Sequence, residues 1–222
     1  SFSTARSGWE AASGFDLEEI DQIIIGMYGN GGQFPRVSMV VRPHTKEGSD
    51  GLLEKWGGPT LNENAGKPFY QAPNGWAYLV PAKGDGAFVM GHPTEIADLA
   101  STDAAAPLLR REIGQLLRVS DSDRHVNVLF APYFLVDGDG RSIFTGEKEK
   151  ALNPLSWFLG DGLKAAMMSV HLTDQLYFEL RMESDVVVDR VVLATQFRDR
   201  MQEIPQAIET YMVNLNPGPY WR

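Results

Sequence analysis

The sequence predicts an α+β fold with mostly antiparallel sheets and helices packed on one face. Two observations carry this prediction. Residues 163–183 alternate apolar and polar side chains, and residues 187–215 place apolar side chains three and four positions apart. A period of two is typical of a half-buried strand, and steps of three and four are typical of an amphipathic helix. The helix should cover the apolar face of the hairpin, and Pro205 should kink or break it.

The register of the hairpin follows because paired residues of antiparallel strands point to the same face. A three-residue loop at 173–175 pairs Leu172 with Leu176, whereas a two-residue loop would pair Leu172 with the polar Gln175. We expect the opposite face to be exposed to solvent, as one face of an antiparallel sheet often is. That face carries Ser169, His171, Tyr177, Glu179 and Arg181.

Shorter elements precede the hairpin. Asp16 and Glu19 have the spacing of a capping box at the start of a short helix, and the β-branched run 22–29 suits a buried strand. A second strand returns at 36–43. Three short strands at 68–91 have apolar residues on both faces, so we expect this sheet to be covered on both sides. Helical patterns follow at 93–101 and 108–119, and a strand at 125–132.

The segment Ser101–Pro107 is the best candidate for a domain boundary, because small residues there separate two helical patterns. It divides the chain into a first half, residues 1–105, and a second half, residues 106–222, which holds the hairpin and the long helix. The order of elements is compatible with two related α+β halves and also with one continuous domain.

Composition disfavours several classes of function. The chain has 222 residues, a formal net charge of −9 and no cysteine. From this balance we expect no basic face for nucleic acid, and an acidic balance argues against docking on anionic membranes. Disulfides and thiolate sites are excluded, and no run of about 18 apolar residues would insert in a bilayer. Because the chain starts without methionine and ends in an aromatic, cationic segment, we expect it to be part of a longer protein.

No motif assigns a catalytic, cofactor-binding or metal-binding residue. The segment 137–141 begins like a calcium loop, but Arg141 and Lys148 stand where oxygen ligands are needed, so a hairpin turn is the better interpretation. The four histidines have no ligand-pair spacing. The face that carries His171 and Glu179 is therefore the one candidate binding surface. Its residue types could support acid–base chemistry, although polar pairs on a solvated sheet would look the same.

Residues 127–182, from Asn127-Val-Leu-Phe-Ala-Pro to Phe178-Glu-Leu-Arg-Met, and the terminal Pro219-Tyr-Trp-Arg222 carry a resemblance. They resemble the uncharacterised C-terminal modules of some bacterial membrane-anchored serine/threonine protein kinases. The resemblance covers about residues 124–222. It implies a non-catalytic, extracytoplasmic part of a receptor-like kinase, and it assigns no functional residues.

Three hypotheses about function remain open. The leading one is a non-enzymatic sensor, scaffold or interaction module of a larger protein, whose partner is a protein or small ligand and which needs no cofactor. The second is a small-molecule hydrolase with a site between the two halves. The third is a structural domain that forms homodimers through a sheet edge or an apolar face.

Overall fold

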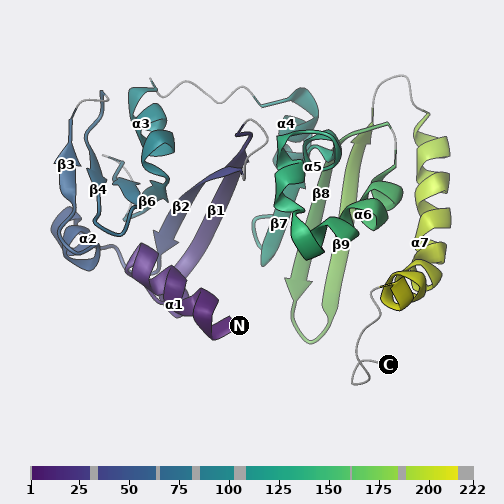
Figure 1. Ribbon diagram of the computed structural model, residues 1–222, viewed down its shortest axis with the longest axis horizontal. Coiled ribbons are helices and arrows are strands. Elements are labelled where there is room, and N and C mark those ends of the chain that lie inside the picture. The colour runs from purple at the N-terminus through teal and green to yellow at the C-terminus, as the bar shows by residue number, and fades with distance from the viewer. Residues whose placement is uncertain are drawn as a thin grey trace. The chain divides into compact units, whose positions relative to one another are not determined.

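The computed structural model describes residues 2–30, 35–63, 66–81, 86–102, 109–160, 162–184 and 189–214. The chain divides into two compact units, residues 1–30 with 35–106 and residues 107–222 (Figure 1). Both units combine antiparallel strands with helices, so the predicted α+β class is confirmed. The predicted boundary at Ser101–Pro107 falls largely on residues 103–108, which lie outside the described residues.

The first unit contains a six-stranded antiparallel sheet in the order β1-β2-β6-β5-β4-β3. Three α-helices and one 3-10 helix accompany it. The elements are α1 (Phe2–Ser13), η1 (Leu17–Glu19), β1 (Ile20–Tyr28), β2 (Arg36–Pro43), α2 (Ser49–Lys55), β3 (Thr60–Asn62), β4 (Phe69–Gln71), β5 (Ala77–Leu79), β6 (Phe88–Gly91) and α3 (Pro93–Ser101).

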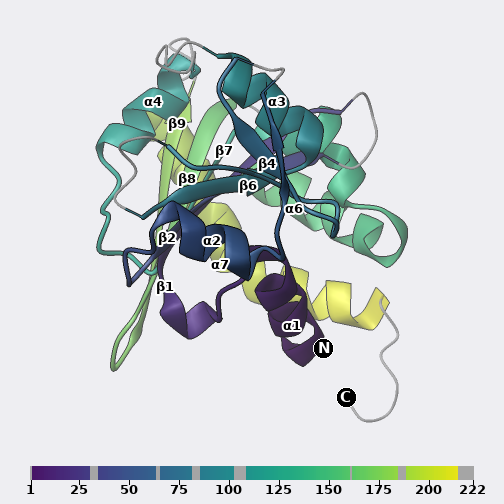
Figure 2. The ribbon, with the colours of Figure 1, turned by 90° about the vertical axis from the view of Figure 1, so that its left-hand side faces the viewer.

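Both faces of the β4–β6 part of this sheet are covered, as the apolar residues on both faces of 68–91 predicted. Phe88 and Tyr78 pack with Trp56, the C-cap of α2, and with the end of α1, whereas Val89 points to the other face and packs with Ile96 of α3. In Figure 2, α3 lies above β4 and β6, and α1 and α2 lie below them. The Trp56 and Tyr78 rings stack at a centroid distance of 4.2 Å, so these aromatic side chains belong to the core.

The prediction that residues 22–29 form a buried strand is wrong. This segment belongs to β1, which is the edge strand of the six-stranded sheet. Ile24, Ile25 and Met27 are exposed, Ile25 by 56%. A β-branched run favours extended backbone whichever position the strand takes in the sheet. Burial depends on neighbouring strands and helices, and β1 pairs with β2 alone among the described strands.

The predicted capping box at Asp16 is confirmed, and it starts the 3-10 helix η1. The Asp16 carboxylate accepts a hydrogen bond from the Glu18 N–H, and the Glu19 carboxylate accepts one from the Asp16 N–H at 2.8 Å. Arg6 of α1 donates to Asp16 at 2.6 Å between Nη2 and Oδ2. The hydrogen bond from Arg6 holds the pKa of Asp16 below its ordinary value.

The second unit contains a three-stranded antiparallel sheet in the order β7-β8-β9. This sheet differs in strand number and connectivity from the first, so the described strands do not form two copies of one topology. The elements are α4 (Arg111–Arg118), β7 (Val126–Phe130), α5 (Pro132–Val136), η2 (Asp139–Ile143), η3 (Gly146–Ala151), α6 (Leu152–Leu159), β8 (Leu163–Leu172), β9 (Leu176–Ser184) and α7 (Arg190–Asn214).

The predicted hairpin register is confirmed. Leu172 of β8 pairs with Leu176 of β9 across a three-residue loop, and His171 pairs with Tyr177. On one face, Met167 packs with Ile113 and Leu116 of α4, so we call it the α4 face. The opposite face packs on residues of α6 and α7 and is called the α6 face; its contacts involve Phe130, Leu180, Met182, Leu159 and Leu193.

The long helix α7 covers less of the hairpin than its apolar spacing predicted. Leu193 and Phe197 in its first turns are buried, but Met201 one turn later is 51% exposed. Pro205 lies inside the helix, and Figures 1 and 2 both show the axis changing direction in the final, yellow part. The proline thus bends the helix without ending it, because the ring removes one backbone donor and crowds the preceding turn.

Candidate functional site

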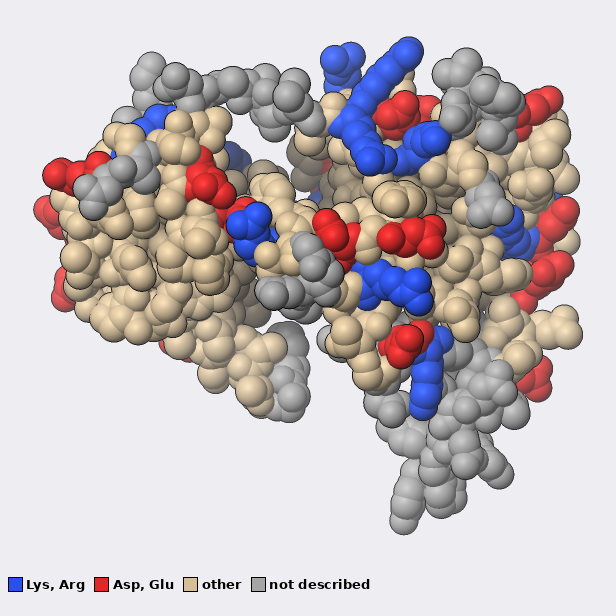
Figure 3. All heavy atoms as spheres, turned by 45° about the horizontal axis from the view of Figure 1, so that its top comes forward, with Lys and Arg blue, Asp and Glu red and all other residues tan. Residues whose placement is uncertain are grey.

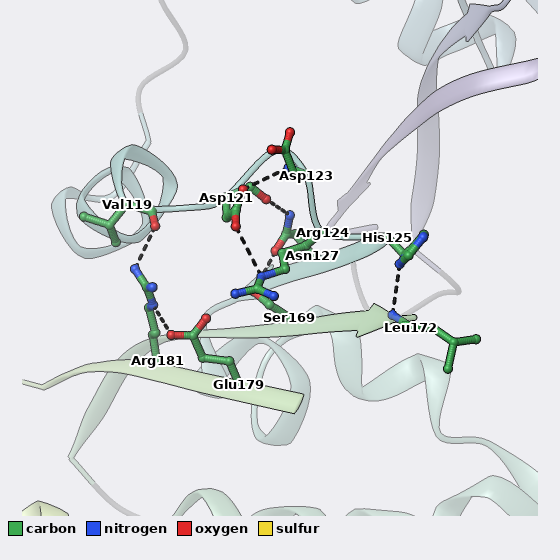
Figure 4. A network of polar contacts seen from close by, with 10 residues as sticks. All are labelled: Val119, Asp121, Asp123, Arg124, His125, Asn127, Ser169, Leu172, Glu179 and Arg181. Carbon is green, nitrogen blue, oxygen red and sulfur yellow. Dashed lines mark hydrogen bonds and ion pairs between the residues drawn. The ribbon is translucent and has the colours of Figure 1, made fainter. Parts of the chain in front are cut away.

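The five residues of the predicted binding surface lie on the α4 face of the second sheet. Ser169 pairs with Glu179, His171 pairs with Tyr177, and Arg181 lies opposite Met167. Figure 4 shows Ser169, Glu179 and Arg181 in a network with residues of the segment that leads from α4 into β7. The predicted face is therefore a real structural grouping, and the roles of its members follow from their contacts.

The expectation that this face is solvated is wrong at its centre. Ser169 is 2% exposed and Met167 is buried. The Ser169 hydroxyl donates to Asn127 Oδ1 at 2.6 Å, and Asn127 Nδ2 donates to the Asp121 carbonyl at 2.8 Å. Burial arises because Ile113 and Leu116, three positions apart on α4, place an apolar stripe against this part of the sheet. Ser169 thus serves to tie the loop before β7 to the sheet.

Arg181 and Glu179 anchor the C-terminal end of α4. Arg181 Nη1 donates to the Val119 carbonyl at 2.7 Å, and Arg181 Nε donates to Glu179 Oε1 at 2.8 Å (Figure 4). Val119 is the C-terminal cap of α4. The last carbonyls of a helix lack partners within the helix, and a cationic side chain is well suited to supply one. This pair therefore has a structural use at the end of α4.

A pair of histidines lies beside this network. The His125 and His171 rings stack at a centroid distance of 4.6 Å, with an interplanar angle of 25°. His125 Nδ1 accepts a hydrogen bond from the Leu172 N–H at 3.0 Å, which places the proton of the neutral ring on Nε2 (Figure 4). His171 Nδ1 is buried and has no hydrogen-bond partner among the described residues. Sequence spacing missed this pair, because β7 and β8 are far apart in the chain.

No metal site is assembled by the part of the chain that the structure describes: no group of three or more His, Cys, Asp or Glu side chains there could hold an ion. The segment 137–141 is not the hairpin turn that the sequence predicted. Asp137 ends α5, and Asp139–Ile143 form the 3-10 helix η2. These residues therefore connect α5 to η2, and Asp and Gly are residue types that favour such a tight change of direction.

The α6 face has an uncovered end near the hairpin turn. Five apolar side chains on adjoining strands are exposed there, and they form what we call the apolar patch: Val126, Val128, Leu172, Leu176 and Phe178. The register makes them neighbours, since Val126 pairs with Val170, Val170 with Phe178, and Leu172 with Leu176. Exposure reaches 62% at Leu172 and 67% at Leu176.

Side chains on this face are less buried the closer they lie to the hairpin turn. Ala166 is fully buried at the end that packs on α6 and α7, Met168 is partly buried, and Leu172 is exposed. Contiguous apolar surface of this kind marks interaction sites on soluble proteins. The apolar patch is therefore the strongest candidate functional site of the second unit.

None of the helices in the described part of the chain is long and apolar enough to cross a membrane. A scan against protein-family models found no matching family, and searches of curated proteins and of solved structures found no match.

Proposed function

We propose that this protein is a non-enzymatic interaction module whose apolar patch binds an amphipathic helix of a partner polypeptide. The observation that carries the proposal is the exposure of five apolar side chains on adjoining strands of one sheet face. The resemblance of residues 124–222 to modules of receptor-like kinases supports a place for it as the non-catalytic, extracytoplasmic part of a larger protein.

The helical nature of the partner follows from the rest of the same face. Leu159 of α6 and Leu193 of α7 cover the far end of this face, where they pack with Leu180 and Met182. A partner helix laid beside them would continue the helical layer and bury the remaining apolar side chains. Apolar anchors at helical spacing that enter a hydrophobic surface are a common mode of peptide recognition.

The polar side of the partner helix should be basic. The chain has a formal net charge of −9, so a cationic partner is favoured during encounter and an acidic one is repelled. Burial of the patch would supply the affinity, and charge would supply the preference among partners. The hydrolase hypothesis stays a prediction, since it concerns a site between the halves.

The test uses a synthetic 18-residue peptide of leucine and lysine with one apolar face, titrated into the full chain by calorimetry. We expect binding that weakens at least tenfold in Leu176→Asp and Phe178→Asp, because each change places a charge in the contact. Tyr177→Asp is the matched control, since Tyr177 is similarly exposed but points to the α4 face. A scrambled peptide of equal composition but without an apolar face controls for charge.

Two results would reject the proposal. One is equal binding of the two peptides, which would show attraction by charge alone. The other is an equal loss in Tyr177→Asp and Leu176→Asp. All three side chains are more than half exposed, so the variants should remain folded, and circular dichroism checks this directly.

A second candidate function, self-association, is favoured by the edge strand β1. This strand spans nine residues, and Ile24, Ile25 and Met27 are exposed on its two faces. A long apolar edge is a template for pairing with another chain. Light scattering over a range of concentrations tests this: we expect a dimer that Ile25→Lys converts to monomer. A chain that is monomeric at every concentration would exclude it.

A further inference from the structure

Helix α4 carries an exposed face with a local excess of positive charge. Arg110, Gly114 and Arg118 follow one another at steps of four, and Arg111 stands beside them, so three guanidinium groups surround a glycine on one face. Leu116 on the other side of the helix packs into the core. Figure 3 shows Lys and Arg side chains, in blue, gathered on the second unit over α4, with acidic atoms, in red, among them.

This face forms an open hollow of about 650 Å³. Gly114 lies among its lining residues, and a Cβ added there would meet nothing within 4 Å. Leu109 and Leu117 also line the hollow, and each is about half exposed. The hollow thus places apolar surface directly beside cationic groups.

The three arginines of the hollow are not neutralised by ion pairs within the described chain. Arg110, Arg111 and Arg118 are exposed, and none of them forms an ion pair with a described residue. Like charges on neighbouring positions of a helix repel one another, and an anion among them relieves the repulsion. Guanidinium groups bind phosphate oxygens through pairs of parallel hydrogen bonds.

The glycine supports the same conclusion. Glycine within a helix is less favourable than alanine. No neighbouring atom in the described chain requires its small size at position 114. The property that Gly114 provides is the open space between the arginines, which lets a ligand approach the helix backbone.

We infer that this hollow binds the phosphate group of a phosphorylated ligand whose apolar part lies against Leu109 and Leu117. The phosphate belongs either to a free small molecule or to a lipid headgroup, since both present the same oxygens to the arginines. The net negative charge of the whole chain does not reveal this local group of arginines, because net charge averages over surfaces of opposite sign.

Three probes test the inference on the full chain: inorganic pyrophosphate, ADP, and phosphatidylcholine vesicles that contain phosphatidic acid. We expect ADP or the vesicles to bind, and to bind more tightly than pyrophosphate. Arg110→Gln and Arg118→Gln should each weaken this binding at least tenfold, whereas the charge-matched control Arg198→Gln, on the exposed side of α7, should change it less than twofold.

Gly114→Leu provides an independent variant, because leucine would fill the hollow while favouring the helix. It should abolish binding without lowering the melting temperature. Arginine-dependent binding of ADP alone identifies a soluble ligand, and of vesicles alone a lipid headgroup; either supports the inference. Failure of all three probes to bind, an equal loss in Arg198→Gln, or pyrophosphate binding as tight as that of ADP and the vesicles would overturn it.

Discussion

Asn127 and Ser169 share one hydrogen bond but differ in burial, and this difference predicts unequal costs when either side chain is truncated. Ser169 is 2% exposed, and its hydroxyl donates to Asn127 Oδ1 at 2.6 Å. Asn127 is only partly buried, and it also donates to the Asp121 carbonyl. Asn127→Ala leaves a buried hydroxyl without its partner, whereas Ser169→Ala leaves an amide oxygen that water can reach.

The magnitudes follow from this asymmetry. A net hydrogen bond contributes about 1 kcal/mol, and a buried polar group without a partner costs about 1–3 kcal/mol. We therefore expect Asn127→Ala to lower the free energy of unfolding by about 2–3 kcal/mol, and Ser169→Ala by about 1 kcal/mol. In the Asn127→Ala background, Ser169→Ala should cost nothing further, because the hydroxyl has already lost its partner.

Urea unfolding followed by circular dichroism measures these free energies in the single and double variants. Thr173→Ala, in the exposed hairpin turn, is the control and should change stability by less than about 0.5 kcal/mol. A cost of Ser169→Ala equal to or above that of Asn127→Ala would refute the reasoning. Strictly additive effects of the two changes would refute it as well.

Two further predictions concern the first unit. The Tyr78 hydroxyl donates to the buried Ala12 carbonyl at 2.6 Å. Tyr78→Phe should therefore cost about 1–3 kcal/mol in urea unfolding, and a cost near zero would contradict this contact. Burial raises the pKa of Tyr78. The contribution of the neutral Tyr78 side chain to stability is therefore complete below about pH 10 and falls as pH rises further. In Tyr78→Phe the free energy of unfolding should fall less steeply above this pH. Arg6 lowers the pKa of Asp16. The contribution of the Arg6–Asp16 ion pair to stability is therefore present above about pH 3.9 and is lost as pH falls below it. Arg6→Gln should raise the pKa of Asp16 in a carboxyl NMR titration, and an unchanged titration would argue against the ion pair.

Local features of this protein could be predicted from its sequence. The register of the β8–β9 hairpin follows from side-chain alternation and loop length, both of which are properties of about twenty consecutive residues. The capping box at Asp16 depends on residues three positions apart. The position of Pro205 within the long helix likewise predicted the bend. In each case the interacting groups are close in sequence, so the local residue pattern is sufficient to predict their contacts.

Other features were decided only by the tertiary structure. The alternation in β8 distinguished two faces but did not show which of them would be buried. In the structure α4 buries the face that carries Ser169, whereas part of the apolar face near Leu176 is exposed. The run 22–29 showed an extended strand but not its place at the sheet edge. His125 and His171 stack only because β7 pairs with β8. The physical reason is that hydrophobic periodicity determines which face of a helix or strand is apolar. Whether that face is buried depends on which distant segments of the chain pack against it.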